Sequence, residues 1–270
     1  MEGKFEFRKL NIRRPWRKGL RLNLLKRTVI GVIIMPVLKK QFIEQSYFEE
    51  TNDYSHIITE LSEYNGEERI NIGCTQLNGE ADKMIFSDIK TYSEQAKKRI
   101  LAEWLDFLQT NTPALKAIHF RSHVPQRLFN AACCQENLEE LYFKWGNYTD
   151  LSALANLKKL KYLYIGSGSS IQDISTLGRI KTLIVLQVVN FKRIEDYSPL
   201  TALDNLEQLV ISGPTLGKTP LKDVDFLVDM KSLVSFWRPN TILRKKYNSH
   251  EQEALLRALP NLTFCYNSRL

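Results

Sequence analysis

Two histidines and two cysteines near the middle of the chain are residue types that bind zinc. His119 and His123 precede the adjacent pair Cys133 and Cys134. Zinc sites usually take cysteines from a Cys-x-x-Cys pair, which this sequence lacks, and His119 falls within a predicted strand. The spacing therefore favours a structural role for these four residues, and we expect no metal site.

No other group of residues has the spacing of a catalytic or cofactor site. The four histidines of the chain show no pairing with a nucleophile. The Gly-Ser loop at 166–170 lacks the Gly-Lys-Ser/Thr ending and the following helix of a phosphate-binding loop. We therefore expect a chain that is not an enzyme and that has no cofactor.

Positive charge is concentrated in the first 40 residues. They hold twelve Lys and Arg against two Glu, while the whole chain has a net charge of +8. One run interleaves an aromatic residue with four charges: Arg13, Arg14, Trp16, Arg17 and Lys18. Such a run is typical of contacts with nucleic acid or an anionic membrane. The alternative is a solvated face, or an arm that pairs with the acidic stretch 42–65, which has no Lys or Arg.

A membrane span and an export signal are both disfavoured. The longest apolar run, 29–38, has ten residues, whereas a spanning helix needs about 20. A twin-arginine export signal would end in a small-residue cleavage site, but this run ends in Lys39-Lys40. The four cysteines are scattered, which is typical of free thiols in a reducing compartment. We expect a cytoplasmic protein.

Two repeated phrases organise the second half of the chain. The phrase Asp-x-Ser-x-Leu begins at Asp150, Asp173 and Asp196, with a variant at Asp223, in steps of 23, 23 and 27 residues. A second phrase, Leu-x-x-Leu-x-apolar with variants, begins at Leu115, Leu138, Leu160, Leu183 and Leu206, with looser copies at Leu233 and Leu262. A fixed period in this range indicates a solenoid of stacked units.

Each repeat is expected to contain one strand and one tight turn. The leucine phrase predicts a short strand whose apolar residues point inward while the intervening residues point outward. The Asp of the other phrase can accept hydrogen bonds from backbone N–H groups at the start of a short helix. Leucines at steps of three, as at Leu154, Leu157 and Leu160, favour 3-10 turns.

Together these phrases resemble the leucine-rich repeat family. The resemblance covers residues 115–265, and the Asp-x-Ser-x-Leu limb is most similar to the bacterial internalin type. It implies an α/β solenoid with short parallel strands on the concave side and short helices or turns on the convex side. Such repeats usually place an Asn after the strand, and here those positions hold Gly146, Gly168, Phe191 and Pro214.

We expect two parts: a basic α+β region at 1–110 and the leucine-rich repeat domain at 111–270. Short strands are predicted at 5–7, 29–35, 70–72 and 84–86, and one or two helices at 42–61. A helix that begins at a capping box of Thr91 and Glu94 and continues to Leu108 is expected to cap the first repeat. A helix capped by Ser249 and Gln252 is expected near the other end.

Strand residues between the buried positions are expected to form an exposed concave surface. The candidates for partner binding are His119, Arg121, Glu140, Tyr142, Lys144, Tyr162, Tyr164, Gln187, Gln208 and Trp237. Outward aromatic side chains anchor protein interfaces, although strand propensity alone also explains them. We therefore predict a module that binds another protein through this surface, with a bacterial antidote or adaptor as one role by analogy of fold. The alternative is a nucleic-acid-associated protein that contacts phosphate through the basic arm.

Overall fold

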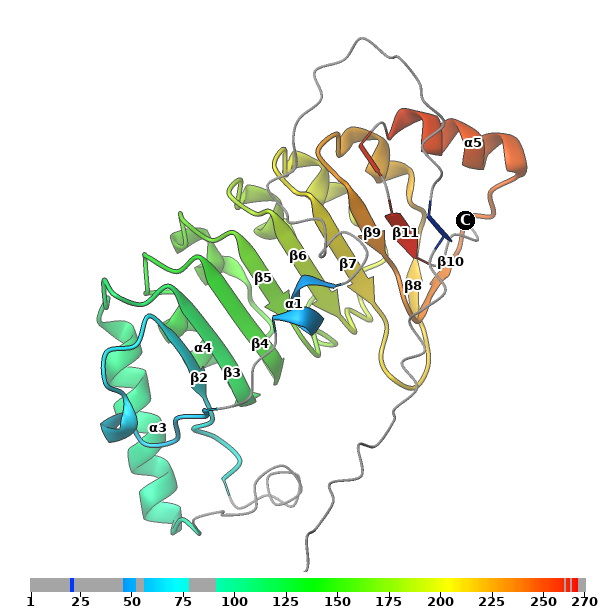
Figure 1. Cartoon of the computed structure of the whole chain (residues 1–270). Helices are drawn as coiled ribbons and strands as arrows, with labels where there is room; N and C mark the ends of the chain where they lie inside the picture. The colour runs from blue at the N-terminus through cyan, green and yellow to red at the C-terminus, as the bar shows by residue number, and fades with distance from the viewer. Residues whose placement is uncertain are drawn as a thin grey trace, which may run out of the picture.

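The computed structural model describes residues 20–21, 46–51, 56–77, 91–259, 261–262 and 264–266. In these residues nine strands form one sheet, in the order β1-β11-β9-β7-β6-β5-β4-β3-β2 (Figure 1). Their bounds are β1 Leu20–Arg21, β2 Arg69–Ile72, β3 Ala117–Val124, β4 Glu140–Gly146, β5 Tyr162–Ile165, β6 Val185–Val189, β7 Gln208–Ser212, β9 Ser235–Trp237 and β11 Phe264–Tyr266. All pairs are parallel except β1 with β11.

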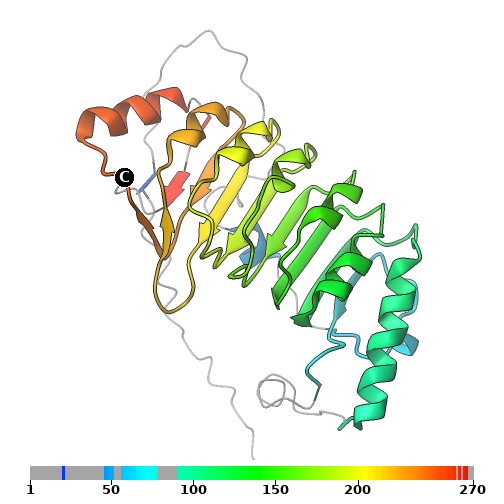
Figure 2. The ribbon, with the colours of Figure 1, turned by 180° about the vertical axis from the view of Figure 1, so that it is seen from behind.

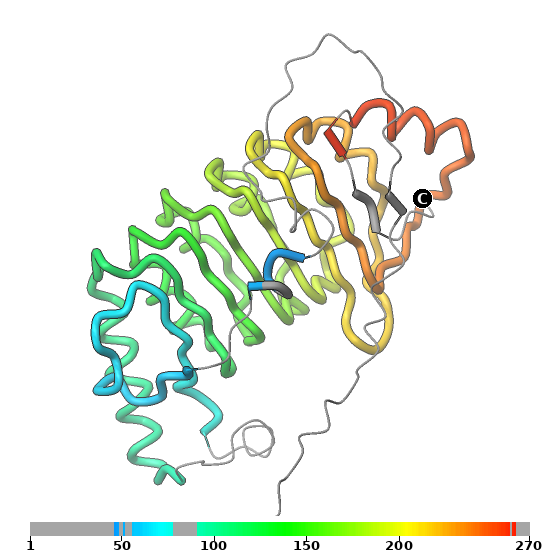
Figure 3. Tube along the Cα trace, in the orientation of Figure 1, coloured from blue at the N-terminus to red at the C-terminus, as the bar shows by residue number. Residues whose placement is uncertain are grey.

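The inward residues of the strands form a continuous apolar ladder. Leu141, Leu163, Leu186 and Leu209 are register partners on successive strands, and Phe236 continues the row. All five side chains are buried in the main core. Because each coil covers its apolar face only with the next coil, the molecule is a solenoid, visible as stacked loops in Figure 3. This α/β solenoid confirms the fold class predicted from the sequence.

The limb opposite the sheet is built from short helices and turns (Figure 2). It contains α4 (Gln126–Ala132) and the 3-10 helices η3 (Ser152–Asn156), η4 (Leu177–Arg179), η5 (Ser198–Ala202) and η6 (Asp225–Asp229). The Asp of each repeated phrase accepts a hydrogen bond from the backbone N–H two residues on, at 2.8, 2.8, 2.9 and 3.1 Å for the successive repeats. The predicted turn chemistry and the 3-10 geometry are both confirmed.

The helix α3 (Glu94–Gln109) is the first element of this limb. Its residues Ile100, Trp104 and Leu108 are buried, as the apolar stripe predicts. The predicted capping box is wrong, because the side chain of Ser93, and not that of Thr91, accepts from the backbone N–H of Ala96 at 3.2 Å. A hydroxyl residue lies at both positions, so sequence spacing alone did not decide between them.

The C-terminal end holds α5 (Ser249–Ala258) and a two-stranded parallel sheet of β8 (Thr219–Leu221) and β10 (Thr241–Leu243). The predicted cap of α5 is displaced by one residue. Asn248 caps the helix by accepting from the backbone N–H of Glu251, and the Glu251 carboxylate accepts from the backbone N–H of Asn248. The reciprocal box is therefore Asn248 with Glu251.

The main sheet continues across the expected boundary at residue 110. The predicted strand at 70–72 is confirmed by β2, which pairs in parallel with β3. Within 42–61 the described residues contain α1 (Tyr47–Glu50), and a 3-10 helix, η2 (Leu61–Glu63), starts at its end; residues 56–60 are not helical, because Ile58 bridges to Ile72. The strands predicted at 5–7, 29–35 and 84–86 lie outside the described residues. In the described part of the chain, no helix is long and apolar enough to span a membrane.

Candidate functional site

The predicted concave side chains form two rows that cross the parallel strands. One row of register partners is Asn71, His119, Tyr142, Tyr164, Gln187, Val210 and Trp237. The other is Arg69, Ala117, Glu140, Tyr162, Val185, Gln208 and Ser235. We call the surface made by these two rows the concave face. Eight of the ten predicted binding residues belong to it, and Arg121 and Lys144 follow two positions after a member on their own strands.

The expectation that these side chains are exposed is wrong. Seven of the ten are buried, among them Glu140 at 1% and Gln208 at 0% exposure, and Lys144, Tyr162 and Tyr164 are half-buried. Near the middle of the concave face, these side chains are buried by another segment of the same chain. Residues 46–48, which are the N-cap and the first two residues of the short helix α1, lie across β4 to β7 (Figure 1).

Tyr47 contacts the concave face through its ring, its backbone and its hydroxyl. Its ring stacks on that of Tyr162, with 4.4 Å between centroids and 8° between planes. Its backbone N–H donates to Oε1 of Gln208 at 2.9 Å, and the hydroxyl of the preceding Ser46 donates to Oε1 of Gln187 at 2.7 Å. The two glutamines of the rows therefore bind polar groups of the segment, which explains why they are buried.

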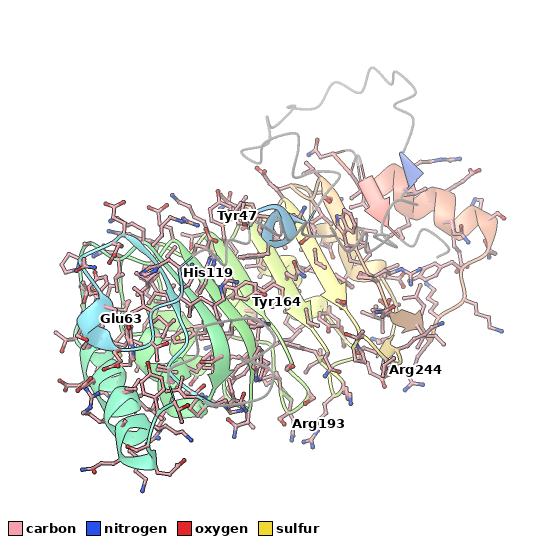
Figure 4. The ribbon with its side chains drawn as sticks, turned by 60° about the horizontal axis from the view of Figure 1, so that its bottom comes forward. Tyr47, Glu63, His119, Tyr164, Arg193 and Arg244 are labelled. Atoms are coloured by element: carbon pink, nitrogen blue, oxygen red, sulfur yellow. The ribbon has the colours of Figure 1, made fainter. Side chains whose placement is uncertain are left out.

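Phe48 fills the space between two tyrosines. Its ring centroid lies 5.7 Å from that of Tyr142 and 5.5 Å from that of Tyr164, both in tilted or edge-on geometry. Tyr142 and Tyr164 stack on each other at 4.2 Å. With Val185 and Val234 these rings form a second hydrophobic cluster, separate from the main core. Figure 4 shows Tyr47 beside the strands that carry Tyr164 and His119.

A buried carboxylate, Glu140, holds the hydroxyl end of Tyr47. Its Oε2 accepts from the Tyr47 hydroxyl at 3.0 Å and from Nη2 of Arg69 at 2.7 Å. Its Oε1 lies 2.7 Å from Nε2 of His119. Arg121 donates to Nδ1 of His119 at 2.9 Å, and because arginine has no acceptor, Nε2 must carry the imidazole proton and donate it to Glu140.

The surroundings of His119, Glu140 and Tyr47 set the charge state of each of these side chains. Burial lowers the pKa of His119, and the charge of Arg121 adds to this, while Glu140 opposes it. Burial alone would raise the pKa of Glu140, but the hydrogen bond from His119 and the charge and hydrogen bond of Arg69 outweigh it, so this pKa is lowered. Burial and the charge of Glu140 raise the pKa of Tyr47. At neutral pH the site thus holds a carboxylate, a neutral imidazole and a protonated phenol.

This arrangement positions a bound segment. The Glu140 carboxylate, the imidazole nitrogens of His119 and the Tyr47 hydroxyl are each engaged by a protein partner. Charge-assisted hydrogen bonds of this kind are about twice as strong as neutral ones and give geometric specificity. Glu140, with Arg69 and His119 bonded to it, therefore orients the hydroxyl end of Tyr47 on the concave face.

Sequence reasoning missed the three residues that occupy the face, Ser46, Tyr47 and Phe48, and the Arg69 and Asn71 that extend the rows. The adjacent aromatic pair was the one available signal, but sequence spacing does not say which surface a segment contacts. Among the other predicted sites, Arg13, Arg14, Trp16, Arg17 and Lys18 lie outside the described residues. Within the described residues, no group of three metal-ligating side chains comes together.

The parallel register, the repeat period and the Asp turns define a leucine-rich repeat fold of the internalin-like type. No protein-family model matches the chain, and no curated protein does. The solved structures that it resembles include two internalins of Listeria monocytogenes. One, inlF, is 24% identical over 57% of this chain and 48% of its own, with a TM-score of 0.41. The other, inlC2, is 23% identical over 56% of this chain and 60% of its own, with a TM-score of 0.38.

A third similar structure is the plant peptide hormone receptor RGFR1 in complex with RGF2. It is 14% identical over 56% of this chain and 31% of that chain, with a TM-score of 0.33. The matched part spans about half the length of inlF and less than two thirds of inlC2. These similarities concern the fold alone.

Proposed function

We propose that this chain is a non-enzymatic module that binds another protein through its concave face. The observation that supports this most directly is that the face already holds a polypeptide segment, Ser46 to Phe48, by stacking and hydrogen bonds. Tyrosine and tryptophan anchors on a rigid scaffold are the residues that contribute most to protein interfaces. The rows present Tyr142, Tyr162, Tyr164 and Trp237 for this purpose.

The scaffold under these residues is rigid enough to present them in fixed positions. Alternate residues of the same strands, such as Leu141 and Leu163, are buried in the main core. Side chains on strands are held more closely than side chains on loops, and a preorganised surface loses less entropy on binding. An adaptor, or an antidote that neutralises a bacterial toxin, is a role that this kind of surface would serve.

Affinity capture from the native cell, with mass spectrometry, tests the proposal. Two variants of the full chain are compared with the wild type: Tyr142→Ala/Tyr164→Ala/Trp237→Ala on the concave face and Arg179→Ala/Asp204→Ala at exposed positions of the other limb. We expect the first variant to lose a partner that the second retains, with both still folded by circular dichroism. Capture of the same partners by all three chains would contradict the proposal.

A second candidate function rests on the charge of the N-terminal arm. Twelve basic residues within the first 40 support binding to nucleic-acid phosphates. The test replaces Arg13, Arg14, Arg17 and Lys18 with alanine in the full chain and measures binding to a fluorescent duplex at several salt concentrations. This candidate requires binding that weakens steeply with salt and that the variant loses.

A further inference from the structure

The segment 46–48 packs on the concave face, and its side chains lie outside the main core of the solenoid. Its rings pack in the second hydrophobic cluster with Tyr142, Val185 and Val234. The main core, which contains the inward residues of the same strands, forms a separate cluster without Tyr47 or Phe48. The stacked coils therefore keep their core whether or not this segment is bound.

Each residue of the segment has a matching subsite. The hydroxyl of Ser46 donates to Gln187 at 2.7 Å, and the Tyr47 hydroxyl donates to Glu140 at 3.0 Å. The ring of Phe48 packs against Tyr142 and Tyr164, and Gln208 accepts from a backbone N–H of the segment. A side-chain amide that binds the backbone tolerates any sequence, whereas the other three subsites select a hydroxyl residue followed by tyrosine and phenylalanine.

The chain after the segment is anchored independently of it. Ile58 donates its backbone N–H to the carbonyl of Asn71 at 2.8 Å and bridges to Ile72, so the chain is fixed to β2 from there onward. Release of residues 46–51 would leave these hydrogen bonds and the pairing of β2 with β3 in place. A segment tethered so close to its site acts at an effective concentration of about millimolar.

We propose that the concave face is a recognition site for a short hydroxyl–Tyr–Phe segment, and that Ser46–Phe48 fills it in cis as an internal competitor that a partner protein displaces with a segment of the same chemistry. This rests on the proposed function, since it names the kind of segment that the same face binds. The partner is expected to carry an aromatic pair preceded by serine or threonine in an exposed stretch.

A labelled peptide of residues 44–51 tests the site. Its affinity is measured by fluorescence anisotropy for the wild-type chain and for Tyr47→Ala/Phe48→Ala, which vacates the face. We expect saturable binding to the variant and at least about tenfold weaker binding to the wild type, because the tethered segment competes. The matched control peptide has alanine in place of both aromatic residues and the same charge, and it should bind neither chain. We call Tyr47→Ala/Phe48→Ala the open variant. Adding Tyr164→Ala to it should weaken its binding of the unsubstituted 44–51 peptide.

A second measurement uses the unmodified chain, so it does not depend on the folding of a variant. We expect a glutamyl endopeptidase to cleave after Glu49 or Glu50 faster when the segment is released, and mass spectrometry distinguishes these two cleavages from all others. The added peptide has the sequence of residues 44–51 with glutamine in place of its three glutamates, so that the protease does not cleave it. In excess it should increase the cleavage rate of the chain by occupying the vacated face, whereas the same peptide with alanine in place of both aromatic residues should leave the rate unchanged.

Failure of the peptide to bind the open variant and to accelerate cleavage would overturn the recognition site. Equal affinity for the wild type and the open variant would overturn the internal competition. Both results come from purified components, so they are separate from the test of the proposed function. Peptide binding without any captured partner would leave this site in place and count against the proposed function.

Discussion

The ring of Tyr47 lies parallel to the ring of Tyr162, 4.4 Å away, although the two residues belong to segments far apart in the sequence. Tyr162 is an outward residue of a repeat strand, where a free face would leave it in solvent. The contact shows that the chain covers part of its own concave face. The face becomes available to another molecule only where residues 46–48 leave it.

Truncation of Tyr47 should reduce stability less than truncation of a core residue. We expect Tyr47→Ala to reduce the free energy of unfolding by about 1–2 kcal/mol, because it removes one stacked aromatic pair and one hydrogen bond. Leu163→Ala, at a fully buried core position, should cost about 2–5 kcal/mol. Urea unfolding followed by circular dichroism measures both. Equal losses would mean that the segment is part of the folded core.

Stability should fall as the pH is lowered from 7 to 4. The pKa of His119 is lowered by burial, so below its ordinary value of 6.5 the unfolded chain takes up a proton before the folded chain does. The pKa of Glu140 is also lowered, so its contribution is present above 4.5 and is lost as the pH falls further. The charged or titratable groups that face this pair include Arg69, Arg121, Tyr47, Tyr142 and Tyr162.

The control for this pH dependence is His119→Gln, measured by thermal unfolding across the same range. It should flatten the upper part of the decline, between about pH 6.5 and 5, and leave the part below 4.5. A pH profile identical to that of the wild type would show that the imidazole is not the group responsible.

The repeated Asp residues should each contribute a small, local amount of stability. Asp173 accepts from the backbone N–H and from the hydroxyl of Ser175, both at 2.8 Å. We expect Asp173→Ala to cost about 1 kcal/mol in chemical unfolding, and Asp173→Asn less, because the amide oxygen can still accept. Asp204→Ala, at an exposed position outside the phrase, is the control and should change stability by less than about 0.5 kcal/mol.

Gly166 should tolerate no side chain. A Cβ at this position would lie 2.0 Å from the carbonyl oxygen of Lys144 on the neighbouring coil. Gly166→Ala must therefore push two coils apart, and we expect a loss of about 2–4 kcal/mol by urea unfolding. Gly217→Ala is the control for backbone strain without a clash. Gly217 has a positive φ of 104°, and a Cβ there would make only an ordinary contact, 3.8 Å from Cγ of Pro214. That change should cost about 1 kcal/mol.

Local patterns predicted most of the solenoid because its interactions are local. The strand phrase, the Asp turns and the 3-10 spacing each involve residues within one coil or its neighbour, so residues such as Leu163 and Asp173 were placed correctly. Helix caps were harder, because Ser93 and Asn248 lie within two residues of equally plausible caps. The choice between them depends on where packing of the helix starts.

The sequence by itself determined the register of the repeats, and with it the side of the sheet on which Tyr142, Tyr162 and Tyr164 lie. Only the tertiary structure decided what covers that side. Tyr47 and Phe48 reach it from a different part of the chain, and contacts at such separation leave no period or spacing in the sequence. The alternation of a strand says which way a side chain points, whereas its exposure depends on every other segment that can pack against it.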